Sequence, residues 1–168
     1  TGGEAITDGL LAKAELAQPC GITTDGVTLF FADSETSSVR SADIDPEGKV
    51  RTIVGLDLFV FGDKDGSDHH VRLQHPIGIT HYDGVLYITD TYNHKVKRIL
   101  PAMRSAFTVW GNGLAGRVDG TAEQAQFSEP SGISFANGNM YIADTNNHAI
   151  RVAGIQSGVV STLEITGL

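Results

Sequence analysis

The sequence predicts an all-β protein in which three four-stranded antiparallel sheets stack side by side, as the blades of a β-propeller do. Two observations predict this fold. One residue pattern occurs three times at fixed intervals along the 168 residues, and each copy contains four short apolar stretches separated by turn residues. Glycine, at 20 residues, exceeds its usual frequency of roughly 7%, which suits short strands joined by tight turns.

Each copy of the repeat begins with an Asp-Gly pair and keeps the same spacing through its central aspartate. A proline follows the glycine by ten residues, an aspartate follows the proline by fourteen, and a basic residue follows that aspartate by seven. The three sets are Asp8, Pro19, Asp33 and Arg40; Asp65, Pro76, Asp90 and Lys97; and Asp119, Pro130, Asp144 and Arg151. We therefore expect one domain over residues 1–168, with blades at about 1–55, 56–112 and 113–168.

Four strands are expected in each copy. The first begins at Ile22, Ile79 and Ile133 and ends at the turns Asp25-Gly26, Asp83-Gly84 and Asn137-Gly138. The second covers 29–32, 86–89 and 140–143, the third passes through Val39, Val96 and Ile150, and the fourth covers 50–54, 107–110 and 159–163. Since the second strands are apolar on both faces, a neighbouring blade must cover each side.

Two local features refine this pattern. The first turn comes one residue early relative to its proline, so we expect a bulge or a three-residue loop there. Apolar residues stand five and three positions before each proline, which predicts a helical or 3₁₀ turn that inserts a large side chain between blades. These residues are Ala14 and Leu16, Val71 and Leu73, and Ala125 and Phe127.

Composition limits the function classes. The net charge of −8 opposes binding to a nucleic-acid backbone. No apolar run of about 18 residues exists that would predict a membrane span. The start of the chain lacks the features of a signal peptide, so we expect any targeting segment to lie outside it. The single cysteine, Cys20, follows a proline in an apolar run and is expected to be a buried, inert thiol.

The second and third copies resemble a known repeat. Asp90-Thr-Tyr-Asn-His-Lys-Val-Lys97 and Asp144-Thr-Asn-Asn-His-Ala-Ile-Arg151 resemble NHL repeats, which are named for the Asn-His of this turn. The first copy has Thr36 and Ser37 at the Asn-His positions, so it resembles a degenerate blade. The resemblance implies a β-propeller fold over nearly the whole chain.

The long form of the repeat is similar to the propellers that follow a thioredoxin-like domain, as in the plant suppressor-of-quenching family and its animal and bacterial relatives. That resemblance implies half of a six-bladed ring and makes the chloroplast lumen a candidate compartment. The residues themselves leave the compartment open. Three blades would leave two apolar faces uncovered, and such faces are association hazards. We expect further blades or a second copy of the chain to close the ring.

The repeated charges are expected to be structural. We expect Asp33, Asp90 and Asp144 to cap turn amides and to pair with Arg40, Lys97 and Arg151 across the hairpin. The alternative is a charged binding ring. Asn93 and Asn147 are expected to adopt the left-handed turn conformation, and His94 and His148 to hydrogen-bond neighbouring backbone.

No cofactor or metal is predicted. None of the six histidines recurs at an inner-strand position in all three copies, as a metal on the propeller axis would require. The acidic stretch from Asp63 to Asp68 lacks the bidentate acid of a calcium loop. Since no nucleophile motif is present either, no catalytic residue is assigned and the segment is expected not to be an enzyme.

One face is expected to bind. In an up-and-down blade, the loop between the second and third strands lies at the same end as the connection between blades. Tyr92, Asn146, His94 and His148 should therefore share a rim with the long loop 56–74, which carries Asp63, Asp68, His69 and His70.

The function expected from these observations is a protein-interaction scaffold whose partner is another protein or an adjacent domain of the same chain. Two alternatives stay open. One is an enzymatic six-bladed propeller of the metal-dependent lactonase or lyase type, with inward acids or histidines from several blades. The other is an RNA-binding NHL module, which the acidic balance opposes.

Overall fold

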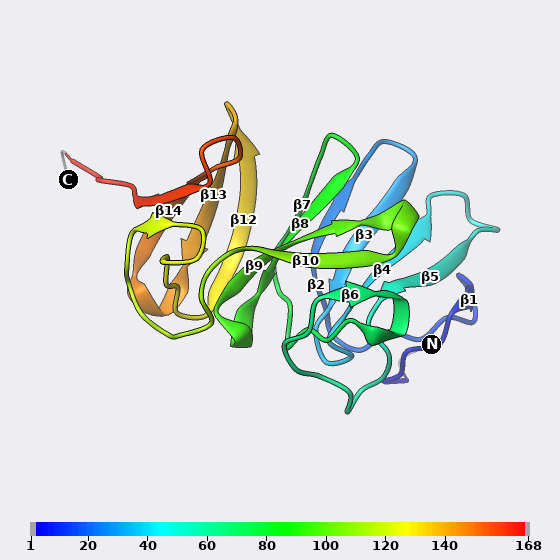
Figure 1. The fold of residues 1–168 in the computed structure, drawn as a ribbon. Helices are drawn as coiled ribbons and strands as arrows, with labels where there is room; N and C mark the ends of the chain where they lie inside the picture. Colours follow the sequence, from blue (N-terminus) through cyan, green and yellow to red (C-terminus); the bar gives the residue numbers. More distant parts are fainter. Residues whose placement is uncertain (1–2, 167–168) are drawn as a thin grey trace.

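A computed structural model describes residues 3–166 of the chain. Three antiparallel sheets of five strands each stand side by side in chain order, and the N and C termini lie at opposite ends of the array (Figure 1). The prediction of an all-β fold with three stacked, propeller-like blades is confirmed.

The strands follow one order in every sheet. The first sheet contains β1 (Gly9–Leu10), β2 (Pro19–Thr24), β3 (Thr28–Asp33), β4 (Ser38–Asp43) and β5 (Lys49–Val54). The second contains β6 (Gly66–Ser67), β7 (Ile79–Tyr82), β8 (Val85–Asp90), β9 (Lys95–Leu100) and β10 (Ser105–Trp110). The third contains β11 (Gly120–Thr121), β12 (Pro130–Ala136), β13 (Asn139–Asp144), β14 (Ala149–Gly154) and β15 (Val159–Thr162).

The four long strands of each blade match the prediction, but every blade has a fifth. The short strands β1, β6 and β11 begin at the glycine of the Asp-Gly pair and add to the last long strand of the same sheet. Gly9, Gly66 and Gly120 have φ of 146°, 148° and 143°, a conformation that other residues rarely adopt. The prediction of four-stranded blades is therefore corrected, because the Asp-Gly pair starts an outer strand.

The inner hairpins form as predicted. Asp83 and Gly84 have φ of 50° and 76°, and Asn137 and Gly138 have φ of 49° and 78°. Positive φ at both central residues is the type I′ geometry that matches strand twist. In the first blade, β2 ends at Thr24 and β3 begins at Thr28, which confirms the three-residue loop.

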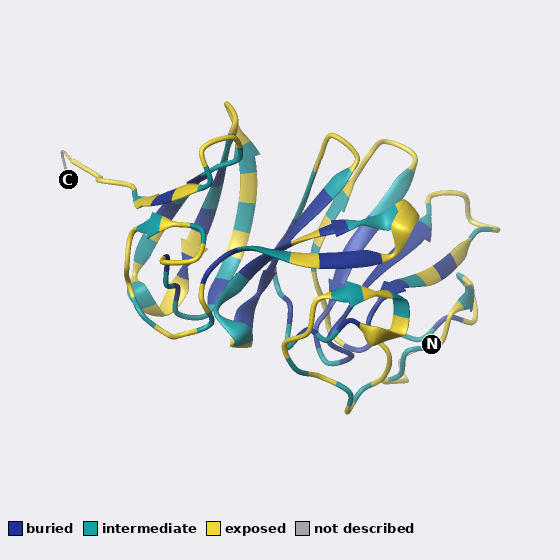
Figure 2. Ribbon diagram, viewed as in Figure 1, coloured by how far each residue is buried: buried dark blue, intermediate teal, exposed yellow. Residues whose placement is uncertain are grey.

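The turn before each proline also forms. In the second blade it is the 3₁₀ helix η1 (Asp68–His70), and in the first and third blades Ala14 and Ala125 donate their N–H groups to residues four positions earlier. Leu73 and Phe127 are fully buried between sheets, whereas Leu16 is half-buried at the edge of the first blade. Figure 2 shows the two buried layers between neighbouring sheets.

The inner strands β2, β7 and β12 make direct backbone contact. Gly21 N–H donates to Ile77 O at 2.8 Å, and a Cβ atom at Gly78 would overlap Ser131 O. The blades therefore approach as closely as backbone allows.

Cys20 is exposed, contrary to prediction. It occupies the position that Ser131 holds in the third blade, where the backbone faces the preceding sheet. Among the described residues no sheet precedes the first blade, so the thiol is uncovered.

Candidate functional site

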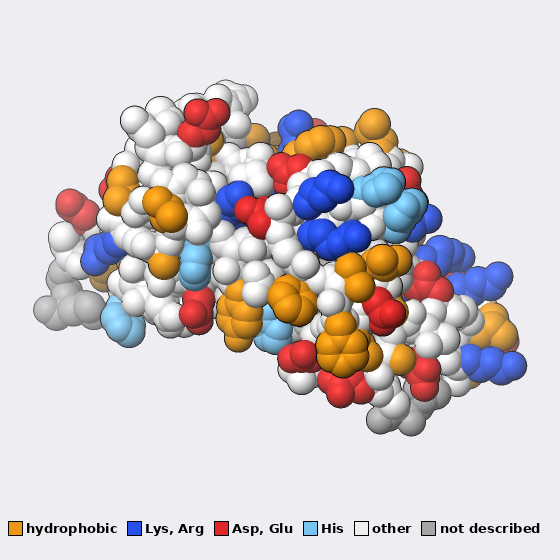
Figure 3. Space-filling view, turned by 60° about the horizontal axis from the view of Figure 1, so that its bottom comes forward, with side chains coloured by type: hydrophobic (Ala, Val, Ile, Leu, Met, Phe, Trp, Pro, Cys, Tyr) orange, Lys and Arg blue, Asp and Glu red, His pale blue; other side chains and the backbone are white. Residues whose placement is uncertain are grey.

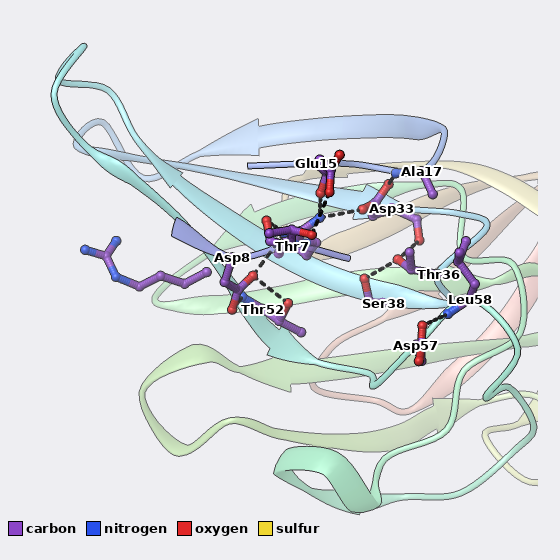
Figure 4. A network of polar contacts seen from close by, with 12 residues as sticks. Thr7, Asp8, Glu15, Ala17, Asp33, Thr36, Ser38, Thr52, Asp57 and Leu58 are labelled. Carbon is purple, nitrogen blue, oxygen red and sulfur yellow. Dashed lines mark hydrogen bonds and ion pairs between the residues drawn. The ribbon is translucent and has the colours of Figure 1, made fainter. Parts of the chain in front are cut away.

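Each blade contains a buried ion pair between the aspartate that ends its second long strand and the basic residue seven positions later. In the first blade, Arg40 Nη1 lies 2.9 Å from Asp33 Oδ2, and both side chains are fully buried. The other carboxylate oxygen of Asp33 accepts the N–H of Ala17 at 2.8 Å (Figure 4). Asp33 therefore joins the end of β3 to the segment that enters the inner strand.

The aspartate of the Asp-Gly pair completes this cluster. Asp8 Oδ1 lies 3.0 Å from Arg40 Nη2, and the Asp8 carboxylate also accepts the N–H and Oγ1–H of Thr52 (Figure 4). Sequence reasoning treated Asp8, Asp65 and Asp119 as turn residues and missed this role. A signal was present, because each stands 32 residues before the basic residue of its own blade.

The third blade repeats the arrangement. Arg151 lies 2.8 Å from both Asp144 Oδ2 and Asp119 Oδ1, and Asp119 accepts the N–H of Thr162. The Arg151 guanidinium also lies over the Phe127 ring, 5.1 Å from its centroid. The planar guanidinium group of Arg151 thus connects Asp119, Asp144 and the Phe127 side chain.

The second blade uses lysine and an additional carboxylate. Lys97 Nζ lies 2.7 Å from Asp63, 2.9 Å from Asp65 and 3.5 Å from Asp90. A lysine ammonium group has three donors but lacks the planar, forked arrangement of a guanidinium group. In the second blade a third carboxylate takes the place of the backbone carbonyls to which Arg40 and Arg151 donate. Lys95 also pairs with Asp63. In each blade the basic residue is thus paired with carboxylates of its own blade.

The pKa shifts have the directions expected of such clusters. Burial raises the pKa of Asp33, and it raises the pKa of Asp90 to about 6 despite the nearby Lys97. Burial acts to lower the pKa of Lys97, but the surrounding carboxylates outweigh it and raise that pKa. Since these groups are buried and paired with charges of their own blade, they indicate structural ion pairs rather than proton donors to a substrate.

The Asn-His turn differs from the prediction in one respect. Asn93 and Asn147 lie in the 3₁₀ helices η2 (Thr91–Asn93) and η4 (Thr145–Asn147), so the expected left-handed conformation is wrong for them. His94 and His148 adopt it instead, with φ of 55° and 51°. The asparagine must stay helical because its amide donates both to the aspartate, at 2.8 Å, and to a loop carbonyl of Gly62 or Gly116.

The histidine position of this turn contacts the next blade. His94 Nδ1 accepts the N–H of Glu129 at 3.1 Å. In the first blade Ser37 stands at this position with φ of 46°, and its hydroxyl accepts the N–H of His75 at 3.2 Å. The first copy, which lacks Asn-His, therefore forms the same left-handed turn and the same kind of hydrogen bond to the next blade. His148 occupies the corresponding position in the third blade, and its side chain makes no hydrogen bond to backbone among the described residues, so the hydrogen bond predicted for His148 is not found.

An exposed aromatic surface lies at the rim between the first and second blades. It consists of Phe59, Phe61, His75 and Tyr92, and we refer to it below as the aromatic surface. The rings of Tyr92 and His75 stack with centroids 4.7 Å apart and planes 7° apart. Phe59, Phe61 and Tyr92 are 88%, 57% and 48% exposed. Figure 3 shows hydrophobic side chains gathered on the lower face of Figure 1, with acidic side chains beside them.

A hollow of about 240 Å³ opens at this surface. Its lining residues come from four loops: Glu35, Ser37, Leu58, Phe59, Phe61, Gln74, His75 and Tyr92. Leu58, Phe59 and Phe61 belong to the connection between β5 and β6. The remaining residues are held by the turns that precede β4, β7 and β9.

The residues predicted to form the rim divide into separate groups. Tyr92 lies at the hollow. Asn146 is exposed one blade away, Asp63 binds Lys95 and Lys97, and Asp68 pairs with Arg104 at 2.9 Å. His69 and His70 lie in η1, with ring centroids 4.1 Å apart. The structure thus does not bring Asp63, Asp68, His69 and His70 to the hollow, and sequence reasoning missed Phe59, Phe61 and His75.

Within residues 3–166 the structure contains no group of three or more His, Cys, Asp or Glu side chains arranged to hold a metal ion. No helix in this range is long and apolar enough to cross a membrane.

Comparisons with known proteins agree with the fold. The NHL repeat family model matches residues 127–153. The chain is 42% identical over 165 residues to the protein Suppressor of quenching 1, chloroplastic, of Arabidopsis thaliana, covering 90% of the chain and 16% of that protein. It is 42% identical over 168 residues to NHL repeat-containing protein 2 of Gallus gallus, covering 91% of the chain and 23% of that protein. The chain thus spans less than a quarter of these relatives.

Solved structures share the architecture. An auxiliary nutrient binding protein from Bacteroides thetaiotaomicron superposes with a TM-score of 0.70 at 20% identity, covering 85% of the chain and 37% of that protein. Virginiamycin B lyase from Staphylococcus aureus superposes with a TM-score of 0.60 at 14% identity, covering 93% of the chain and 44% of the lyase. At these identities the likeness concerns the fold alone. The chain belongs with the NHL-repeat β-propeller proteins.

Proposed function

We propose that this segment is a non-catalytic propeller scaffold that binds protein, either a separate partner or an adjacent domain of its own chain, through the aromatic surface. The observation that carries the proposal is the exposure of Phe59 and Phe61 beside the stacked rings of His75 and Tyr92. Large apolar side chains clustered on an otherwise polar surface typically mark an interaction site. Aromatic residues are also enriched where proteins bind each other most strongly.

The buried ion pairs support this function by holding the rim in place. Asn93 connects the turn that carries Tyr92 to Asp90 and to the carbonyl of Gly62, which closes the loop that carries Phe59. His75 is held by the Ser37 hydroxyl of the first blade. A surface organised before binding loses less conformational entropy on association.

Site-specific photocrosslinking tests the proposal. A photoreactive phenylalanine analogue would replace Phe59 in the full-length protein, expressed in its own host, with the same analogue at Leu114 as the control. Leu114 lies in the corresponding loop of the next blade and is 63% exposed. We expect a defined protein adduct, or a defined crosslink within the chain, from position 59 only.

Equal labelling from both positions, or no adduct from position 59, would contradict the proposal. An adduct with RNA at position 59 would favour the nucleic-acid alternative. Stoichiometric metal in the purified protein, together with turnover of a lactone or lyase substrate, would favour the enzymatic one.

A further inference from the structure

We infer that the segment recognised by the aromatic surface is cationic: a large apolar side chain flanked by lysine or arginine. This inference rests on the proposed function. It concerns the chemistry of the bound segment. Its test distinguishes failure of this inference from failure of the proposed function.

The lining of the hollow favours an apolar group. Leu58, Phe59 and Phe61 supply one wall, and the parallel rings of His75 and Tyr92 supply a flat face. Burying an apolar side chain there would remove the exposed Phe59 ring from water as well, which gives the favourable free energy of the contact.

One carboxylate lines the hollow, and a second belongs to the residue before Leu58. Glu35 lines it, with Oε1 3.8 Å from His75 Nδ1. The Asp57 carboxylate accepts the N–H of Leu58 at 2.8 Å and has no cationic partner among the described residues. Lys95 and Lys97, on the strand that follows the Tyr92 turn, are already bound to Asp63.

Cationic flanks on the partner would therefore meet the carboxylates of Glu35 and Asp57, while acidic flanks would be repelled. The net charge of −8 adds to this preference at longer range.

A comparison within the chain shows that the repeat does not require this surface. The connections from Gly55 to Asp65 and from Gly111 to Asp119 begin in the same conformation, with φ of 105° and 103°. The first is two residues longer and carries Phe59 and Phe61, whereas the second has neither aromatic residue. The aromatic pair belongs to an insertion in one loop, and the blade core does not depend on it.

Peptide binding to the full-length protein tests the inference. Three fluorescein-labelled probes would be compared by anisotropy: Lys-Lys-Leu-Phe-Lys-Lys, Glu-Glu-Leu-Phe-Glu-Glu and Lys-Lys-Ala-Ala-Lys-Lys. We expect the first to bind about tenfold more tightly than either of the others, with an affinity that falls as salt is added. The variant Glu35→Gln should weaken the first probe about threefold. The control Glu47→Gln, on the β4–β5 hairpin, should not.

The variant pair Phe59→Ser and Phe61→Ser should abolish binding of the first probe, while Leu114→Ser should leave it unchanged. Binding of the glutamate probe as tight as that of the lysine probe, or no binding of the lysine probe, would overturn the inference and leave the proposed function standing if position 59 still crosslinks. Unchanged binding in the Phe59 and Phe61 variant would overturn both.

Discussion

Arg151 Nη1 lies 2.8 Å from Asp144 Oδ2, and solvent reaches neither side chain. Arg151 is the cationic partner of Asp144, and Arg151 also pairs with Asp119. Through Asn147, which donates to the same Asp144 oxygen, the pair also orders the turn at the rim of the third blade. The conformation of this rim turn is thus coupled to charges in the interior.

Removing the cation of this pair should destabilise the fold. Arg151→Met leaves Asp144 buried without its partner, which typically costs about 3–5 kcal/mol. We expect that loss in equilibrium urea unfolding, and a partial recovery when Asp144→Asn is added. The exposed Arg117→Met should change stability by less than about 0.5 kcal/mol. A loss for Arg151→Met no larger than that of Arg117→Met would contradict the structural role of the pair.

The lysine and additional aspartate of the second blade should be able to replace Arg151 and Arg117 in the third blade. Arg151→Lys alone should destabilise the third blade by about 1–3 kcal/mol, because Arg117 stands where the second blade has Asp63. Adding Arg117→Asp supplies the missing acid at the same spacing of 34 residues and should restore most of the loss. A double variant that unfolds as easily as the single one, measured by thermal denaturation, would show that Asp63 does not compensate for lysine.

Asp90 should make the free energy of unfolding fall as pH rises. Its folded pKa of about 6 lies above the ordinary 3.8, so the folded protein binds this proton more tightly than the unfolded chain does. The resulting stabilisation is complete below about pH 4 and is lost as pH rises through 6. Relative to Asp90→Asn, the wild-type protein should therefore lose up to about 3 kcal/mol between pH 4 and 7. The opposite slope in urea unfolding would contradict the raised pKa.

Much of the fold could be predicted because the repeat fixes positions that local chemistry explains. Asp83-Gly84 and Asn137-Gly138 determine their hairpins through backbone conformation alone. The fifth strand was missed because an Asp-Gly pair is also a common turn signal, and only the distant β10 or β15 shows that it pairs. Cys20 was misplaced because its burial depends on a preceding sheet rather than on neighbouring residues.

The candidate site was predictable only in part. Topology placed Tyr92 near the long connection between blades, and the structure finds it at the hollow. The charged and histidine residues of that connection drew attention, yet Asp63 turns toward Lys97 and η1 carries His69 and His70 elsewhere. The sequence analysis assigned no role to Phe59 and Phe61, and their exposure depends on contacts that no local pattern encodes.

The close packing of equivalent blades supports every conclusion above, and a single methyl group tests it. Gly78→Ala places a Cβ atom into the backbone of Ser131 in the next blade, whereas Gly132→Ala, at the same point of the repeat, would meet only Ala143 Cβ at 3.5 Å. In equilibrium unfolding of the 168-residue chain, we predict a loss of about 1–3 kcal/mol for Gly78→Ala. A Gly78→Ala variant as stable as the wild-type chain would contradict the stacked arrangement of the blades.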